Sequence, residues 1–536
     1  MMKYTEHFST TATPQSQAIP GREKDMSPNN AGGVTFTLDK WGVLNRFLVL
    51  GSEGGTYYVS EQKLTADNAK NIVACITEDG LRVVKTIVEI SEAGRAPKNS
   101  PAIFALALCA KNGDDATRKA ANDAVAKVCR TGTHLFEFCQ YVKDLGGFGR
   151  GLRKGVGKFY TERPADKLAY QIIKYRQRNG WEHKDVLRLT HPVFKDTSAN
   201  QIAKWLMRKD GVEIKSESAL IEAFEHIQKL TAKDTKEAIK LINDHKLTWE
   251  MIPTDLLNSK DVWMAMLPHM PLMAMTRNLG KMSAIDLLSS NLSSATKLVV
   301  SKLADKDALR KSRMHPIAIL TALRTYANGR GVKGSLVWTP VQKVVDALDT
   351  AFYASYDNVE PTGKNIMLAL DVSGSMGWAG VGVLTAREIT AAMSLVTANV
   401  EPNYEIMGFA TQFTPIKISP KTRLDAVCGA LSNIPFGGTD CSLPMTYALK
   451  KKMPIDGFVV YTDNETYFGS VHPSQALNQY RKQMGRNAKL VVVATSATEF
   501  TIADPTDSGM MDVAGFDSNV PQVIGDFIRS GTSESK

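Results

Sequence analysis

The sequence Ile366-Met367-Leu368-Ala369-Leu370-Asp371-Val372-Ser373-Gly374-Ser375-Met376 decides the fold of the last third of this chain. A short, continuous apolar run is typical of a strand that is covered on both faces. The strand should end at Asp371, and the Ser-Gly-Ser that follows should be a loop. Ligands of open α/β sheets lie at the carboxyl ends of strands. Asp371, Ser373 and Ser375 are therefore candidates to hold a hard cation such as Mg²⁺, which prefers oxygen ligands.

Two later segments complete a pattern with this stretch. Thr439 follows a Gly-Gly pair, and Asp463 follows a second apolar strand. In this order, the three pieces resemble the metal-ion-dependent adhesion site (MIDAS) of von Willebrand factor A domains. The resemblance implies that Ser373, Ser375 and Thr439 ligate the metal directly, and that Asp371 and Asp463 ligate it directly or hold metal-bound waters. Such a site has few direct charges and would recruit an acidic group from a partner.

The surrounding sequence has the texture of one α/β domain. From residue 361 to residue 536, apolar strands alternate with amphipathic helices, which predicts a mostly parallel, doubly wound, Rossmann-like sheet with helices on both faces. Competing enzyme sites are not supported. Ser373 and Ser375 do not lie in a GxSxG motif, and no nucleophile with a general base is evident.

The first 360 residues have a different organisation. Residues 1–33 are polar and rich in proline, and we expect a flexible leader. Residues 34–360 contain roughly a dozen helical patterns joined by short loops, which predicts an all-α array of HEAT-like helix pairs.

The basic charge of the chain belongs entirely to this helical part. The net charge is +10, and residues 361–536 contain 14 Lys and Arg against 16 Asp and Glu, whereas residues 1–360 contain 51 against 39. The imbalance favours a polyanionic partner for the helical part, with nucleic acid preferred over an acidic membrane surface.

Residues 143–188 concentrate this charge, with twelve Lys and Arg against five acids. We interpret residues 146–160 as a Gly-rich basic loop with aromatics that can stack on unpaired bases. We expect a helix over residues 166–179, closed by a left-handed Asn179-Gly180 cap, with Lys167, Lys174 and Arg178 on one exposed stripe. A plain solvated face is the alternative. The candidate RNA-binding residues are Lys143, Arg150, Arg153, Lys154, Lys158, Lys167, Lys174, Arg176, Arg178, His183, Lys184 and Arg188.

The six cysteines form no CxxC pair, and their number is too small for a disulfide framework in a chain of 536 residues. The N-terminus lacks the apolar region of a signal peptide, and no apolar run is long enough to span a membrane. We therefore expect a cytoplasmic protein with reduced thiols, and the nucleus is a second expected location.

The pairing of a basic helical domain with an intracellular A domain resembles the Ro autoantigen family, whose helical part is the TROVE domain. The echoes are Asp371–Met376, Tyr175–Asp185 and Gly149–Arg153, and the resemblance covers residues 34–536. It implies HEAT-like repeats closed into a ring by the A domain, and binding of small Y RNAs on the outer surface of the ring. It also implies capture of misfolded noncoding RNAs, whose single-stranded 3′ ends enter the central hole, for quality control.

Three hypotheses follow for the function. The first is a non-enzymatic, RNA-binding subunit of a small cytoplasmic ribonucleoprotein, monomeric as a protein. The second is an interaction module that recruits an acidic partner through a divalent cation, most simply Mg²⁺, in the A domain. The third, a metal-dependent hydrolase, has the least support because no catalytic pair is evident.

Overall fold

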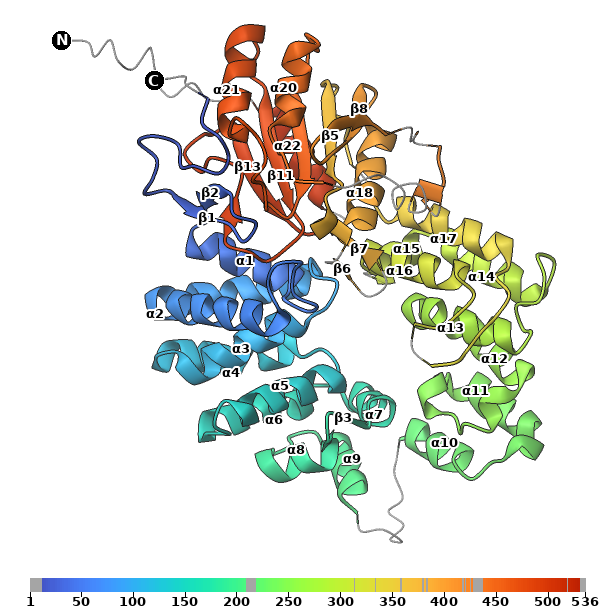
Figure 1. Ribbon diagram of the computed structural model, residues 1–536. Coiled ribbons are helices and arrows are strands. Elements are labelled where there is room, and N and C mark those ends of the chain that lie inside the picture. Colours follow the sequence, from blue (N-terminus) through green and yellow to red (C-terminus); the bar gives the residue numbers. More distant parts are fainter. Residues whose placement is uncertain are drawn as a thin grey trace.

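The computed structural model describes residues 12–530, except 209–217, 313, 333, 357–358, 378–379, 382–383, 417–418, 420, 425, 428–436 and 518. It contains a helical domain and an α/β domain, in the predicted order (Figure 1). No helix in this described part is both long and apolar enough to cross a membrane.

The α/β domain, called the A domain below, is built on a sheet of six strands in the order β13-β11-β10-β5-β8-β9. Only β9 runs antiparallel to its neighbour. The strands are β5 (Ile366–Asp371), β8 (Tyr404–Phe409), β9 (Phe413–Pro415), β10 (Gly457–Thr462), β11 (Lys489–Ala494) and β13 (Met510–Ala514). Every residue of β5 is buried, as the apolar run predicts.

Helices cover both faces of this sheet because strand side chains alternate between them. Met367 and Ala369 of β5 share one core with α20 and α21. Leu368 and Leu370 belong to the other core, which includes residues of α18 and α22 and continues into the helical domain. The helices are α18 (Ala386–Val400), α20 (Leu443–Lys450), α21 (Pro473–Met484) and α22 (Val520–Arg529).

The helical domain forms two arms. The first contains α1 (Lys40–Leu50), α2 (Glu61–Ala93), α3 (Ser100–Asn112), α4 (Asp115–Val128), α5 (Gly132–Asp144), α6 (Arg150–Thr161), α7 (Ala165–Lys174), α8 (His183–Thr190) and α9 (Thr197–Met207). The second contains α10 (Ala219–Ile227), α11 (Thr235–His245), α12 (Lys260–Met266), α13 (Leu272–Ala284), α14 (Ser294–Ala304), α15 (Lys306–Ser312), α16 (Pro316–Ala327) and α17 (Gln342–Ala354).

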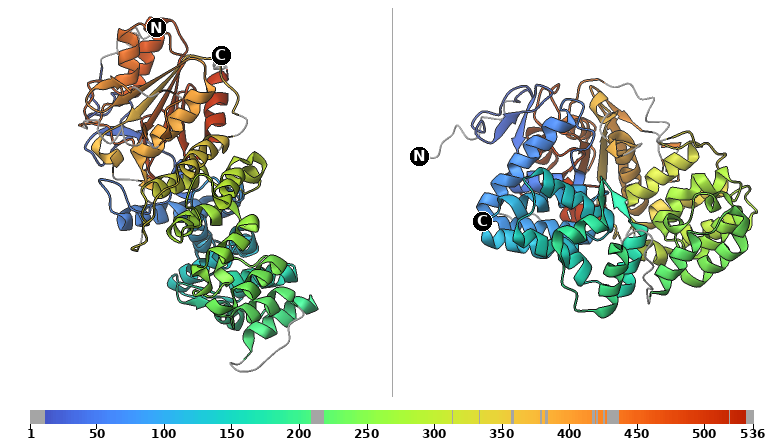
Figure 2. Two further views of the ribbon diagram at one scale, coloured as in Figure 1. Left: turned by 90° about the vertical axis from the view of Figure 1, so that its right-hand side faces the viewer. Right: turned by 90° about the horizontal axis from the view of Figure 1, so that it is seen from below.

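The arms and the A domain close into a ring, as predicted. The arms contact each other where α7 meets α10, and the A domain joins their other ends (Figure 1). In the side view, the A domain lies at one end of the molecule and both arms extend away from it (Figure 2). Arg95, just after α2, pairs with Asp517 of the A domain, and the Arg95 carbonyl contacts His315 Nε2 at the start of α16.

Residues 12–33 are not a free leader, which corrects the expectation for that part of 1–33; residues 1–11 lie outside the described part. Strand β1 (Met26–Pro28) pairs with β2 (Val34–Thr37), and β2 pairs with β12 (Phe500–Thr501) of the A domain. The segment lies against the A domain because its polar side chains bind partners there. One example is the bidentate contact of Arg22 with Asp504, at 2.6 and 2.8 Å.

The Gly-rich segment 146–160 is also not a loop along its length, because Arg150–Thr161 forms α6. The glycines of this helix allow it to pack closely against α4. A Cβ atom at Gly155 would lie 2.6 Å from the backbone oxygen of Asn122. The glycine therefore serves helix packing here rather than access of a ligand to the backbone.

Two alanine substitutions in α6 are expected to have opposite effects. Gly155→Ala should lower the free energy of unfolding by about 1–3 kcal/mol, because the new methyl group forces α4 and α6 apart. Gly151→Ala should be neutral or stabilising by up to about 1 kcal/mol, since its Cβ would meet only the side-chain nitrogen of Asn122, at 3.1 Å. Urea denaturation of both variants measures the difference, and equal stabilities would contradict the packing role of Gly155.

Candidate metal centre and nucleic-acid interface

The five candidate metal ligands lie at the carboxyl edge of the A-domain sheet, and all are buried. Strands β5 and β10 are neighbours, so Asp371 and Asp463 follow adjacent strand ends. Ser373 Oγ and Ser375 Oγ are 3.1 Å apart, and the Ser375 hydroxyl hydrogen-bonds the Asp463 carboxylate. The structure thus brings together four of the five residues by direct contact.

Thr439 reaches the same edge through a loop. Its carbonyl oxygen accepts hydrogen bonds from the backbone N–H groups of Tyr467 and Phe468, in the loop after Asp463. Two residues on, the Cys441 thiol lies 3.7 Å from the Thr462 hydroxyl, which in turn donates to Asp371 at 2.7 Å.

The charge of this cluster fits a hard divalent cation. Burial, together with the nearby Asp463 carboxylate, raises the pKa of Asp371 to about 7. Burial also raises the pKa of Asp463. Two buried carboxylates without a cation are unfavourable, and a bound Mg²⁺ would remove that penalty. The described residues hold no group of three or more His, Cys, Asp and Glu arranged for a metal, so the hydroxyl groups would complete the ligand set.

The candidate RNA-binding residues separate into three groups. The first, which we call the basic face, contains five exposed cations: Lys143, Arg150, Arg153, Lys154 and Arg178. Lys143 Nζ lies 5.9 Å from the Trp181 ring centroid, and the ring centroids of Trp181 and Phe148 are 6.1 Å apart. Arg153 and Lys154 follow Arg150 by one turn of α6, and none of the three forms an ion pair with any described residue.

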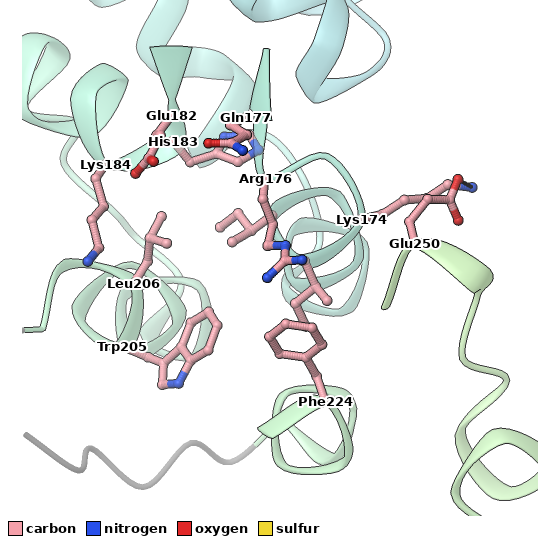
Figure 3. A pocket seen from close by; sticks show the side chains of 12 residues that line it. Lys174, Arg176, Gln177, Glu182, His183, Lys184, Trp205, Leu206, Phe224 and Glu250 are labelled. Carbon is pink, nitrogen blue, oxygen red and sulfur yellow. Dashed lines mark ion pairs between the residues drawn. The ribbon is translucent and has the colours of Figure 1, made fainter. Parts of the chain in front are cut away.

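The second group lines a cavity of about 480 Å³ between the arms. It contains Lys174, Arg176, His183 and Lys184, together with Trp205 of α9, Phe224 of α10 and Glu250 of the second arm. Figure 3 shows the side chains of Lys184 and Arg176 reaching toward the space lined by the Trp205 and Phe224 rings. The guanidinium of Arg176 lies 5.5 Å from the centroid of Phe224.

The third group contains Lys158, Lys167 and Arg188. Lys167 and Arg188 are exposed on α7 and α8. Lys158 is paired with Asp123 at 2.7 Å, so it is less available to a phosphate.

The predicted helix over 166–179 is too long, and its exposed stripe does not exist. Helix α7 ends at Lys174, whose side chain is 9% exposed and lies 3.7 Å from Glu250. Arg178 lies instead in a hairpin, in which β3 (Gln177–Arg178) pairs with β4 (Trp181–Glu182). Asn179 and Gly180 form its two-residue turn with φ angles of 52° and 74°. Asn-Gly is a strong hairpin signal, and this signal should have outweighed the helix cap.

His183 is buried in the core, at the inner wall of the cavity between the arms. It is 1% exposed, and the Tyr160 hydroxyl lies 2.8 Å from its Nδ1. Burial lowers its pKa to about 3, so the ring is neutral at physiological pH.

This pKa predicts an acid-sensitive stability. The folded protein resists protonation of His183, whereas the unfolded chain accepts the proton near pH 6.5. The contribution of His183 to stability is therefore complete above pH 6.5 and should fall toward pH 3 by about 1.4 kcal/mol per pH unit. His134 and His315, whose pKa values burial lowers to about 4, add to the same slope. Asp371 and Glu465, whose pKa values burial raises to about 7, oppose it. Urea denaturation from pH 7 to pH 4.5 measures the slope of unfolding free energy against pH. His183→Gln should change this slope by the equivalent of one proton, about 1.4 kcal/mol per pH unit. An unchanged slope would contradict a neutral, buried His183.

Known families match both domains. The TROVE domain family matches residues 27–325, and the Ro60 vWA domain family matches residues 365–528. The chain is 40% identical to RNA-binding protein RO60 of Deinococcus radiodurans over 521 residues, which cover 96% of this chain and 97% of the relative. The chain belongs to the Ro60 family.

Two further comparisons agree with membership in the Ro60 family. RNA-binding protein RO60 of Caenorhabditis elegans is 36% identical, and the match covers 93% of this chain and 89% of that protein. The crystal structure of the Deinococcus radiodurans RO (RSR) protein superimposes with a TM-score of 0.70 and covers 92% of this chain and 99% of that one. The Ro60 family thus accounts for both the helical ring and the A domain.

Sequence reasoning missed the far side of the cavity. Trp205, Phe224 and Glu250 come from three separate elements, and no local pattern connects them with Arg176. The only available signal was the position of two aromatic residues shortly after a strongly basic stretch.

Proposed function

We propose that this member of the Ro60 family is an RNA-binding, non-enzymatic subunit of a small cytoplasmic ribonucleoprotein. Its ligands would be Y RNA and misfolded noncoding RNAs with single-stranded 3′ ends, in a role in RNA quality control. The observation that carries the proposal is the basic face, which combines five exposed cations with the neighbouring rings of Phe148 and Trp181. The names of the relatives, which describe RNA-binding proteins, support the same ligand class.

The basic face has the chemistry that RNA recognition needs. Lysine and arginine side chains contact phosphates without reading sequence, and aromatic rings stack on unpaired bases. The cavity between the arms adds a second place for an unpaired nucleotide, because it combines Arg176 and Lys184 with the rings of Trp205 and Phe224. Duplex and single-stranded parts of one RNA would then contact different parts of the ring.

Filter binding across a salt series tests this function. We expect the logarithm of the affinity for a structured small RNA to fall linearly as the logarithm of the salt concentration rises, because phosphate contacts release counterions. Binding without a salt slope would contradict phosphate contacts. The proposal also assigns no catalytic activity, so RNA recovered after incubation with the protein should be intact.

We also propose that the A domain holds a divalent cation, most simply Mg²⁺, through Ser373, Ser375, Thr439, Asp371 and Asp463. The buried carboxylate pair beside two adjacent serine hydroxyls favours this second function. The bound cation would attract an acidic group of a partner protein. Mg²⁺ should raise the melting temperature of the wild-type protein but not that of Ser373→Ala, and an equal rise in both would contradict the assigned ligands.

A further inference from the structure

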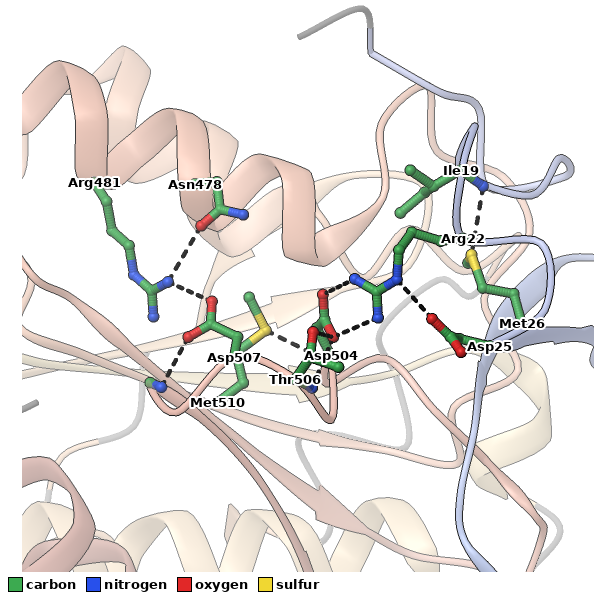
Figure 4. A network of polar contacts seen from close by, with 11 residues as sticks. Ile19, Arg22, Asp25, Met26, Asn478, Arg481, Asp504, Thr506, Asp507 and Met510 are labelled. Atoms are coloured by element: carbon green, nitrogen blue, oxygen red, sulfur yellow. Dashed lines mark hydrogen bonds and ion pairs between the residues drawn. The ribbon is translucent and has the colours of Figure 1, made fainter. Parts of the chain in front are cut away.

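The segment of residues 12–33, which we call the N-terminal strap, runs along the edge of the A domain that carries the candidate metal ligands. Figure 4 shows one anchor of the strap, where Arg22 contacts both Asp25 and Asp504. Other strap residues reach the two loops that supply Thr439 and Asp463, which we call the metal loops: residues 437–440 and 463–469.

Gln15 of the strap joins the two metal loops with one side chain. It is fully buried, and its amide nitrogen donates to Asp440 Oδ1 at 2.8 Å and to the Val471 carbonyl at 2.8 Å. The Thr466 hydroxyl contacts the amide oxygen of Gln15, and the same hydroxyl lies 3.1 Å from the carbonyl oxygen of Thr439. Residues of both metal loops are therefore tied to one buried amide.

A second set of contacts holds the loop that contains Asp463. Glu465 is fully buried, and its carboxylate accepts hydrogen bonds from the Asn30 backbone at 2.8 Å, the Asn30 side chain at 2.7 Å and the Ala31 backbone at 3.1 Å. The backbone N–H of Glu465 donates to Asp463 Oδ1 at 3.1 Å. The strap thus fixes the residue that orients the Asp463 carboxylate.

The strap packs tightly against the metal loops. A Cβ atom at Gly33 would lie 1.9 Å from the Thr466 carbonyl oxygen, and one at Gly469 would lie 2.1 Å from the Gln15 amide nitrogen. Backbone of the strap and backbone of the metal loops are therefore in direct contact, and the loops cannot shift without the strap.

We propose that the N-terminal strap positions the metal loops, and that Gln15 sets the affinity of the A domain for its divalent cation. The inference rests on the proposed metal site. Groups that hold metal ligands in place without touching the metal typically contribute tenfold to hundredfold in affinity. Here that contribution comes from the opposite end of the chain, so a cation would bind well only to an A domain on which the strap is seated.

Isothermal titration of the full chain with Mg²⁺ tests the inference. Gln15→Met keeps the size and burial of the side chain but removes its hydrogen bonds, and it should weaken Mg²⁺ binding at least about tenfold. Gly469→Ala should do the same, because its methyl group would collide with the Gln15 amide and with the Asp440 carboxylate that accepts its hydrogen bond. Arg22→Ala is the matched control, since it loosens a strap anchor on Asp504 rather than on the metal loops, and it should change the affinity less than about twofold.

The outcomes separate the inference from its premise. Wild-type affinity in Gln15→Met would overturn the role of the strap while the metal site stands, and an equal loss in Arg22→Ala would overturn the assignment of that role to Gln15. No Mg²⁺ binding by the wild-type protein would overturn the metal site and the strap together. Circular dichroism of each variant in EDTA should match the wild type, and Gly469→Ala provides the second test if Gln15→Met does not fold. RNA affinity, measured in parallel, should be unchanged in Gln15→Met and in Arg22→Ala.

Discussion

Combined replacement of Arg150, Arg153 and Lys154 by alanine is expected to weaken RNA binding by roughly 100-fold to 500-fold at 0.1 M salt. Each side chain is exposed on α6, and none forms an ion pair within the described part of the chain. A lost phosphate contact removes the counterion release of that contact, which at this salt concentration is roughly fivefold to eightfold in affinity. Three contacts therefore multiply to the expected loss.

The salt dependence gives this prediction its sharpest test. The slope of log affinity against log salt should become less steep by about two to three. The matched control replaces Lys450, Lys451 and Lys452 of the A domain, which carry the same charge outside the helical arms. Filter binding measures both variants, and equal losses would show that net charge rather than the basic face controls binding.

Arg46→Ala is expected to lower the free energy of unfolding by about 3–5 kcal/mol, the usual result of removing one partner of a buried ion pair. Arg46 of α1 is 1% exposed and joins the helical domain to the A domain. Its guanidinium donates to the carbonyl oxygens of Thr498 and Phe500 at 2.9 and 2.7 Å, and it contacts both carboxylate oxygens of Asp512. Without Arg46, the Asp512 carboxylate stays largely buried, and among the described residues only the Thr501 hydroxyl remains as a side-chain partner, at 2.7 Å.

Two comparisons test this prediction by urea denaturation. Arg118→Ala removes an exposed pair with Asp115 and should cost less than about 1 kcal/mol. The double variant Arg46→Ala/Asp512→Ala should lose less than the sum of its single variants, because the unpaired charge is gone. A cost below about 1 kcal/mol for Arg46→Ala would show that this contact does not hold the domains together.

Much of the A domain follows from sequence, because the relevant signals are local. The side chains of the apolar run before Asp371 enter the cores on both faces of the sheet. Such a run is therefore recognisable as a buried strand from its residues alone. The polar residues that follow β5 and β10 come together because adjacent parallel strands end at the same edge. The positions of Asp371 and Asp463 were therefore predictable from two short segments.

The basic region shows where local signals fail. Its charge pointed to the correct region of the molecule, but the element boundaries depend on neighbours that are distant in sequence. Residues 150–161 become a helix whose glycines allow contact with Asn122, and Lys174 turns inward to Glu250. Burial rather than charge decides the role of His183, and burial depends on how the helices of the arm pack together.

The sequence by itself determined two domains, a basic helical array and a set of oxygen ligands at a sheet edge, since charge and apolar periodicity are carried by neighbouring residues. Only the tertiary structure decided that residues 12–33 are part of the A domain's ligand edge. Gln15 contacts residues more than 400 positions away, such as Asp440, and a polar leader carries no local mark of such partners. The physical reason is that a buried hydrogen bond depends on both of its groups, and the chain brings the second group into place only when the ring closes.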